Sequence, residues 1–280
     1  MVKYKIEMIR KKDNAKMFKI ISLSVLSFAV IIFFKKNFYE IKSKNIKPVN
    51  FSYDILKEKD KNIFNALDLE TQNSYIIYDI KNATSVSEVN STTKYPLASI
   101  TKLMTAYLAL SDCKYSDVEK IKHMLVISSN EDADEIADQC GGLEKFVNKM
   151  NGTANLLGLN MTFENPSGLD KSSDTVATAF GDSLSVAKLI ALMSKKYPNI
   201  MDSTTHGYYD GAPNTNAEAS SWPFLLASKT GFTDVAGGNL ATVFSPSPEE
   251  EIAIVVLGST RERRFQSVLD LLKKYIENIK

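Results

Sequence analysis

The pattern of hydrophobic and polar residues changes its period along the chain, and this change predicts where strands and helices lie. Residues 74–80 are rich in β-branched and aromatic side chains, which predicts a strand. A polar stretch follows, which we interpret as a turn region. Apolar residues then recur at helical spacing, so a series of helices is expected. These helices are predicted over residues 99–110, 131–139, 143–157 and 182–195, with 124–127 leading into the second of them.

The last third of the chain returns to strand patterns. Strands are predicted over residues 224–232, 239–244 and 252–258, which Gly- and Pro-bearing turns separate. Residues 263–279 place their apolar side chains on one face of a closing helix. A strand, a run of helices, a run of strands and a last helix predict an α+β fold. In it an antiparallel β-sheet is flanked by helices and joined to a helical subdomain.

The N-terminal part of the chain has the pattern of a membrane anchor. Residues 1–19 carry a basic excess, and the fifteen residues 20–34 carry no charge. Fifteen residues are fewer than the roughly 20 that span a bilayer core, but basic residues flank the stretch on both sides. We interpret 1–19 as a cytoplasmic tail and 20–36 as an uncleaved transmembrane signal anchor, with the body of the protein outside. A cleaved signal peptide and a buried helix are the alternatives.

Composition and charge indicate the domain boundaries and argue against some partners and cofactors. Residues 37–65 are polar and Lys-rich, as in a linker, which leaves 66–280 as the folded domain. The formal net charge of +1 gives no reason to expect a nucleic-acid partner. The two cysteines and two histidines lack metal-site spacing, so we expect no metal or other cofactor. Cys113 and Cys140 could form a disulfide or remain as two buried thiols.

Three short segments suggest the chemistry. Ser99 and Lys102 form an S-x-x-K segment, 128–130 forms S-x-N, and 229–231 forms K-T-G. In this order the set is typical of β-lactamases and penicillin-binding proteins. Each segment is weak evidence alone, because S-x-x-K arises by chance in most chains of this size. Together they make acyl transfer through a serine ester the leading hypothesis.

The first segment has the residues of a nucleophile and its base. Ser99 and Lys102 are three residues apart on a predicted helix, so their side chains share a face. The helix start also favours a developing oxyanion. A lysine with an ordinary pKa of about 10.4 is protonated at neutral pH, and a base needs a pKa near 7. Burial and a neighbouring cation, for which Lys229 is the candidate, would lower the pKa in this way.

The other two segments have a plain reading and a functional one. Ser128 and Asn130 could simply cap the next helix. In the functional reading, Ser128 relays a proton to the leaving amine and Asn130 binds the substrate backbone. Lys229 could simply be an edge-strand lysine before a turn. In the functional reading, Gly231 would let a substrate approach closely, while Lys229 and Thr230 would bind a carboxylate.

Longer stretches around these segments extend the pattern. The sequence YPLASITKLMTA over 95–106 resembles the nucleophile segment of the D-alanyl-D-alanine carboxypeptidase family, the low-molecular-weight penicillin-binding proteins. Residues 163–169 resemble the central turn of that family. Residues 229–233 with 236–238 resemble its substrate strand, and 255–258 its closing strand. The resemblance covers about residues 66–280.

The resemblance implies a role for each matching residue. Ser99 would be the acyl-ester nucleophile, Lys102 the proton acceptor and Ser128 the second active serine. The backbone N–H groups of Ser99 and Phe232 would form the oxyanion hole. The residues expected to bind substrate are Asn130, Lys229, Thr230, Gly231, Phe232 and Arg264, the last through the terminal carboxylate of the peptide.

The implied reaction removes the terminal D-alanine from peptidoglycan stem peptides that end in D-Ala-D-Ala. β-Lactam antibiotics would acylate Ser99 instead. With the anchor, this predicts a single-pass protein of the cell membrane whose catalytic domain lies outside the cytoplasm. The alternatives are a related D-Ala endopeptidase, a serine β-lactamase, and a penicillin-binding wall sensor with weakened catalysis. Between the second and third segments, Glu164, Asn165 and Pro166 belong to the carboxypeptidase-like turn, and they do not form the Glu-x-x-x-Asn arrangement that a deacylating β-lactamase needs.

The chain departs from the family in two respects. Only 25 residues separate Lys102 from Ser128, which is much shorter than the family norm. Cys113 and Cys140 bracket this shortened region, and a disulfide there is a hypothesis for how the region is held. The C-terminal β domain of many relatives is also missing, so we expect the membrane tether to be N-terminal.

Overall fold

The computed structural model describes residues 74–171 and 175–278. The chain divides into two units, Met1–Lys61 and Asn62–Lys280, and all described residues belong to the second. The expected tail, anchor and linker therefore lie outside the described residues and stay predictions. Within the described ranges, no helix combines the length and apolar character needed to cross a bilayer.

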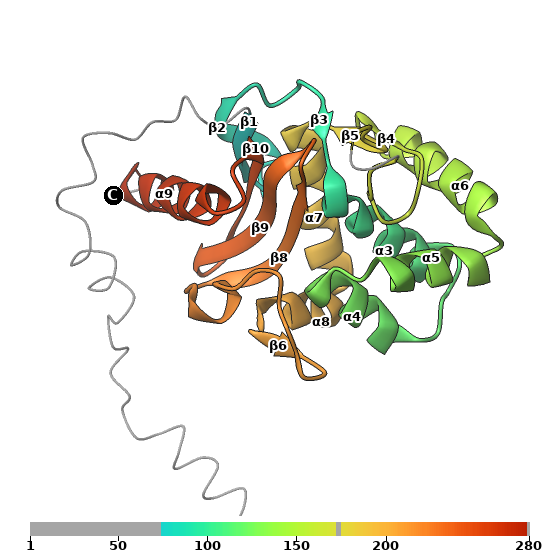
Figure 1. The fold of residues 1–280 in the computed structure, drawn as a ribbon. Helices are drawn as coiled ribbons and strands as arrows, with labels where there is room; N and C mark the ends of the chain where they lie inside the picture. The colour runs from blue at the N-terminus through green and yellow to red at the C-terminus, as the bar shows by residue number, and fades with distance from the viewer. Residues whose placement is uncertain (1–73, 172–174, 279–280) are drawn as a thin grey trace, which may run out of the picture. The chain divides into compact units, whose positions relative to one another are not determined.

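A five-stranded antiparallel sheet lies at the centre of the described unit (Figure 1). The first strands pair with the last ones, so that Ser74 on β1 lies opposite Leu257 on β10. The strand order β2-β1-β10-β9-β8 leaves β8, which carries the third motif, at one edge. The strands are β1 (Ser74–Asp79), β2 (Thr84–Val89), β8 (Leu225–Thr233), β9 (Gly237–Ser247) and β10 (Glu250–Ser259).

The two faces of this sheet enter two separate hydrophobic clusters, because successive side chains of a strand point to opposite faces. On β1, Ile76 enters the larger cluster and Ile77 the smaller one. Helix α9 (Arg263–Asn278) covers the smaller cluster, and α7 (Ser183–Lys196) packs on the opposite face as part of the larger one (Figure 1). The sheet is thus covered by helices on both faces.

The helical subdomain lies on the α7 side and carries the first two motif segments (Figure 1). Its helices are α3 (Lys102–Ser111), α4 (Val118–Ile127), α5 (Asn130–Gln139), α6 (Leu143–Leu156) and α8 (Pro198–Asp202). The short strands are β3 (Tyr95–Pro96), β4 (Met161–Phe163) and β5 (Ala179–Gly181) in one sheet, and β6 (Tyr208–Tyr209) with β7 (Ala212–Pro213) in a hairpin. The 3₁₀ turns are η2 (Ala98–Thr101), η3 (Ser203–Thr205) and η4 (Ala219–Ser221).

The predicted α+β fold, with its antiparallel sheet and flanking helices, is confirmed, but local predictions differ. The polar region after β1 contains a strand, β2, with turns at 80–83 and 90–93 on either side of it, and is not a turn region throughout. Its side chains are mostly exposed, so its strand conformation comes from pairing with β1 rather than from a buried face. Residues 118–127 form a complete helix, which Asp117 caps by accepting a 3.0 Å hydrogen bond from the N–H of Lys120.

Cys113 and Cys140 form a disulfide, with 5.6 Å between their Cα atoms. The bridge joins the segment after α3 to the C-terminal end of α5. The sequence left open whether these two cysteines form a disulfide or remain as buried thiols, and in the structure they form the disulfide.

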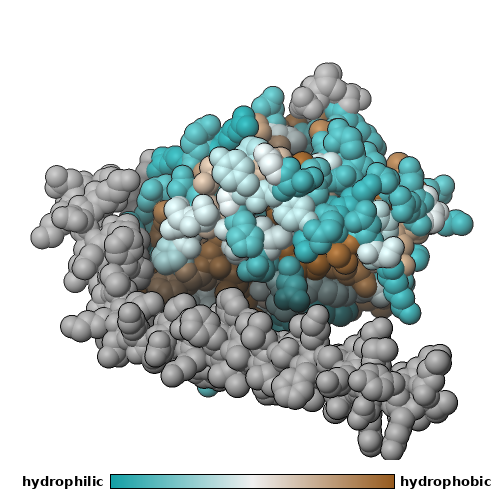
Figure 2. All heavy atoms as spheres, turned by 90° about the horizontal axis from the view of Figure 1, so that it is seen from below, coloured by the Kyte–Doolittle hydropathy of each residue, from teal (hydrophilic) through white to brown (hydrophobic). Residues whose placement is uncertain are grey.

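Hydrophilic residues cover much of the surface seen from below in Figure 2, and hydrophobic residues are visible in a smaller area toward the lower edge of the described surface. The buried apolar side chains form the two clusters described above. This distribution agrees with a core that is built between the sheet and its helices.

Candidate active site

Ser99 lies in the 3₁₀ turn η2, immediately before α3 begins at Lys102. The Nζ atom of Lys102 donates a 2.9 Å hydrogen bond to Ser99 Oγ. The preceding residue, Ala98, has a φ of 47°, in the left-handed region that non-glycine residues rarely adopt. Strain of this kind is common at active sites, where the surrounding structure holds it in place. The expected serine–lysine pair is therefore present, at a turn and not in the first turn of a continuous helix.

The amine of Lys102 has no exposed surface and three oxygen partners. Besides Ser99, Nζ donates to Asn130 Oδ1 at 2.7 Å and to the carbonyl oxygen of Ser167 at 2.8 Å. Burial lowers the pKa of Lys102 to about 7, although the carboxylates of Asp134 and Glu131 act in the opposite direction. A neutral amine at this position can accept the proton of a serine hydroxyl at neutral pH.

The second segment joins two helices, and its three residues have separate tasks. Ser128 follows α4 with a φ of 65°, again in the left-handed region. Ser129 caps α5, because its Oγ accepts a 3.0 Å hydrogen bond from the N–H of Asp132. The capping role that the sequence left open is thus taken by Ser129. The side chain of Ser128 instead contacts Lys229, and that of Asn130 contacts Lys102.

Lys229 on β8 is the second buried amine of the site, with 1% of its surface exposed. Its Nζ donates to Ser128 Oγ at 2.9 Å and to the carbonyl oxygen of Thr230 at 2.9 Å. Burial, helped by the positive charges of Lys102 and Arg264, lowers the pKa of Lys229 well below its usual value. The two lysines thus hold the two serines of the site, one each.

Thr215 belongs to the site, although no sequence pattern indicated it. The Oγ1 atom of Thr230 lies 2.7 Å from that of Thr215. Thr215 also donates from N and from Oγ1 to the carbonyl oxygen of Val126 near the end of α4, both at 3.1 Å. It therefore ties the third motif to the helix that leads to Ser128. A lone threonine between weak strands carries no signal in a single sequence.

The predicted turn at 165–168 supplies a backbone ligand to the site. Its geometry requires glycine at position 168, where φ is 75° and an added Cβ would lie 1.9 Å from the carbonyl oxygen of Ala98. The Oγ1 atom of Thr105 donates a 2.6 Å hydrogen bond to the carbonyl oxygen of Pro166 on the same turn. The turn is thus fixed against η2 and α3, and it presents the Ser167 carbonyl to Lys102.

The strand β8 contacts η2 closely at Gly231. An added Cβ at Gly231 would lie 2.7 Å from the carbonyl oxygen of Leu97 and 3.2 Å from the backbone nitrogen of Ile100. The expected oxyanion donors, the N–H groups of Ser99 and Phe232, belong to these two neighbouring segments. The side chain of Phe232 is 38% exposed.

Arg264 lies in the first turn of α9 and is 5% exposed. Its Nη1 donates a 2.7 Å hydrogen bond to the carbonyl oxygen of Gly231. Burial and the charge of Arg261 lower the pKa of Arg264 to about 10, so it remains protonated at neutral pH. Its expected contact with a substrate carboxylate stays a prediction.

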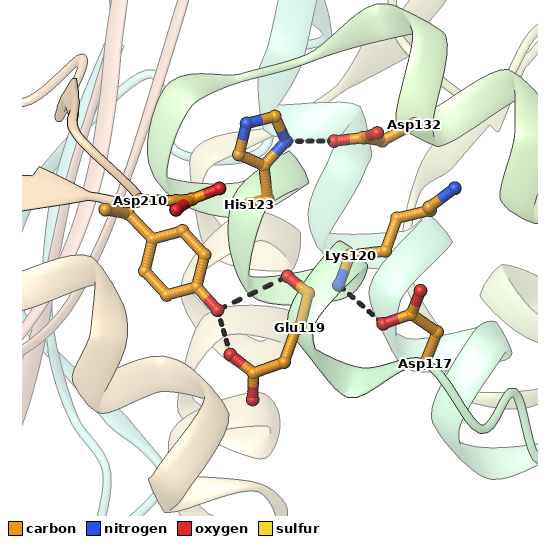
Figure 3. A pocket seen from close by; sticks show the side chains of 7 residues that line it. Asp117, Glu119, Lys120, His123, Asp132 and Asp210 are labelled. Carbon is orange, nitrogen blue, oxygen red and sulfur yellow. Dashed lines mark hydrogen bonds and ion pairs between the residues drawn. The ribbon is translucent and has the colours of Figure 1, made fainter.

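A separate polar cavity of about 610 Å³ lies where α4, α5 and β6 meet (Figure 3). None of the motif residues lines it. In this cavity His123 contacts the carboxylate of Asp132, and the Tyr209 hydroxyl contacts Glu119. The remaining lining residues are Asp117, Lys120 and Asp210.

The chain matches a family model described as D-alanyl-D-alanine carboxypeptidase over residues 111–261. The match includes the second and third motif segments. Ser99 and Lys102 precede the matched range, so their assignment rests on the contacts described above. No curated protein matches the chain.

Solved structures of penicillin-binding proteins share the fold. Penicillin-binding protein D2 from Listeria monocytogenes, in its ampicillin-bound form, is 25% identical, with a TM-score of 0.65 over 72% of this chain and 96% of that one. The D-alanyl-D-alanine carboxypeptidase DacD from Francisella tularensis is 19% identical, with a TM-score of 0.64 over 79% and 74%. PBP3 from Streptococcus pneumoniae, a peptidoglycan synthesis regulatory factor, is 21% identical, with a TM-score of 0.65 over 74% and 72%.

Proposed function

The chain belongs to the D-alanyl-D-alanine carboxypeptidase family, and from this premise we propose that Ser99 is its acyl-ester nucleophile and Lys102 the base that activates it. The protein is a serine-type D-Ala-D-Ala carboxypeptidase. The observation that supports the two roles best is the 2.9 Å contact between Lys102 Nζ and Ser99 Oγ. The lysine in this contact is fully buried, and its pKa is about 7.

Acylation follows from this geometry. Neutral Lys102 accepts the hydroxyl proton of Ser99 while Oγ attacks the carbonyl carbon of the penultimate D-alanine. The N–H groups of Ser99 and Phe232 stabilise the oxyanion that forms. Asn130 and the Ser167 carbonyl hold the lysine amine in line with Ser99 Oγ, because they accept its other hydrogen bonds.

Departure of D-alanine requires a proton on its amine. Ser128 relays to this amine the proton that Lys102 took from Ser99, and Lys229, whose Nζ lies 2.9 Å from Ser128 Oγ, orients the Ser128 hydroxyl. Thr230 and Lys229 bind the terminal carboxylate, with Gly231 and Phe232 along the same strand edge. Water then attacks the Ser99 ester, Lys102 accepts a proton from this water, and the proton passes to Ser99 Oγ as the ester bond breaks. The products are the shortened peptide and free D-alanine, with one water consumed.

The substrate is a peptidoglycan stem peptide that ends in D-Ala-D-Ala, and β-lactams are acylating inhibitors. The ampicillin-bound and cefotaxime-bound relatives from Listeria monocytogenes support the second point. We further propose that residues 20–36 anchor the chain in the cell membrane with the catalytic domain outside. Protease added to intact cells should then cleave the catalytic domain and spare the first 19 residues. Cleavage only after lysis would contradict this orientation.

The acyl-enzyme is the direct test of the assigned roles. A penicillin should add its own mass to the full chain, and Ser99→Ala should abolish the adduct. The control variant Ser116→Ala removes an exposed hydroxyl outside the site and should keep it. A wild-type chain that is folded but stays unlabelled would contradict the assignment. Rapid, repeated turnover of nitrocefin instead of a stable adduct would favour the β-lactamase alternative.

A further inference from the structure

Arg264 is a buried charged residue directly behind the strand that carries the K-T-G segment. Its Nη1 donates to the carbonyl oxygens of Gly231 at 2.7 Å and of Asn239 at 3.5 Å. The guanidinium carbon lies 4.7 Å from the centroid of the Phe265 ring, which restricts the orientation of the guanidinium group. The hydrogen bond to the Gly231 carbonyl is therefore made by a charged guanidinium group whose orientation is restricted.

The carbonyl that Arg264 binds is part of a functional peptide group. The C=O of Gly231 and the N–H of Phe232 belong to one peptide bond, and in a trans peptide they point in opposite directions. An arginine that holds the oxygen from the α9 side therefore directs the N–H away from α9. This N–H is one of the two proposed oxyanion donors.

The charge of Arg264 also acts on this peptide electronically. A cation at a carbonyl oxygen draws electron density toward that oxygen and makes the attached N–H a stronger donor. Because the side chain is only 5% exposed, water screens this effect little. The orientation and the polarisation of the Phe232 N–H group therefore both stabilise the negative oxygen of the tetrahedral intermediate.

We propose that Arg264 is a positioning residue for the oxyanion hole, which acts through the Gly231–Phe232 peptide and not by direct contact with the substrate. The proposal rests on the proposed function. It predicts that loss of Arg264 weakens stabilisation of the tetrahedral intermediate more than it weakens substrate binding. Direct binding of the substrate carboxylate predicts the reverse.

Penicillin acylation separates the two roles, because its binding constant and its first-order acylation rate can be measured independently. In Arg264→Gln the first-order rate should fall by about 10- to 100-fold, which is somewhat less than the loss of a whole oxyanion donor. The binding constant should change by less than about threefold. Arg264→Lys keeps the charge but loses the planar fork, so its rate should lie between those of wild type and Arg264→Gln.

A boronic acid that lacks the terminal carboxylate provides an independent readout. It forms a tetrahedral adduct on Ser99 without needing a carboxylate partner, so its affinity reports the oxyanion hole alone. Its affinity should fall in Arg264→Gln by a factor similar to that of the acylation rate. The control variant Lys274→Gln removes an exposed charge from the same helix and should change neither value.

A positioning role of Arg264 and direct binding of the carboxylate predict different results in these measurements. Weaker penicillin binding with an unchanged acylation rate and unchanged boronate affinity in Arg264→Gln would overturn the proposal and favour direct carboxylate contact. If Arg264→Gln fails to fold by circular dichroism, Arg264→Lys decides. The infrared stretch of its ester carbonyl in the acyl-enzyme should move to higher wavenumber than in wild type, and an unchanged stretch would overturn the proposal. A wild-type chain that penicillin does not acylate contradicts the proposed function itself.

Discussion

The Nζ atom of Lys102 lies 2.7 Å from Oδ1 of Asn130, and this contact joins the N-terminal ends of α3 and α5. Both helices are ten residues long, and the Cys113–Cys140 disulfide joins the chain at their other ends. The helix pair that carries the base and its partner is thus held at both ends. This is how the structure accommodates the short connection between the first two motifs.

Loss of the disulfide should therefore affect stability. The bridge closes a loop with a sequence separation of 27 residues, and a loop of this size corresponds to about 3 to 4 kcal/mol in the chain-entropy treatment. We expect a Cys113→Ser, Cys140→Ser double variant to lose up to that amount, as measured by urea unfolding. Reduction of the wild-type protein should reproduce the loss, and the reductant should leave the double variant unchanged. Equal stabilities of oxidised wild type and double variant would contradict the bridge.

The pH dependence of acylation should report Lys102. Because the amine must be neutral to act as a base, the acylation rate should rise with pH through about 7 and then level off. Asp134 raises the pKa of this lysine, so Asp134→Asn should move the midpoint to lower pH. Asp138→Asn, one turn further along α5, is the matched control. A midpoint that stays at the same pH in Asp134→Asn would argue against Lys102 as the titrating group.

Burial of Lys102 should also lower stability at neutral pH. The folded pKa of about 7 lies below the unfolded value, so the unfolded chain binds more protons between these values and stability rises with pH across that window. This lowering of the pKa of Lys102 reduces the free energy of unfolding at pH 7 by about 4 kcal/mol. Lys102→Met removes this cost together with the activity. The stability difference between wild type and variant should therefore become more favourable to wild type from pH 7 to pH 10. A difference independent of pH would contradict the lowered pKa.

Gly168 offers a test of the central turn. An added Cβ at this position would overlap the carbonyl oxygen of Ala98, next to the nucleophile. We expect Gly168→Ala to lose at least about 2 kcal/mol of stability and most of its penicillin labelling. Gly152→Ala, inside α6 with open space around its Cα, should be neutral or stabilising by up to about 1 kcal/mol. Normal labelling of folded Gly168→Ala would show that the turn does not position the site.

The sequence was sufficient to predict the parts of the molecule whose chemistry lies in side chains at fixed spacing. The S-x-x-K, S-x-N and K-T-G segments do meet, through Lys102–Asn130 and Lys229–Ser128. The strands that enter a core on both faces, β8 to β10, were also predictable from their apolar runs.

Other parts of the site had no signal in the sequence, for physical reasons. The Ser167 partner of Lys102 is a backbone carbonyl, which every residue has. Thr215 reaches Thr230 only because the chain folds back after α8. The strand β2 is polar because both of its faces are largely exposed, so its pairing partner determines its conformation. In each case contacts between residues far apart in the sequence, and not the local composition, determine the structure.

The most direct test of the central claim is release of D-alanine from a stem pentapeptide that ends in D-Ala-D-Ala, measured with the full chain. Wild type should release one D-alanine per peptide, and Ser99→Ala, shown to be folded, should release none. A wild-type chain that releases no D-alanine although penicillin acylates it would contradict the carboxypeptidase account. Cleavage restricted to cross-linked peptides would instead identify an endopeptidase, and equal release by wild type and Ser99→Ala would exclude Ser99 as the nucleophile.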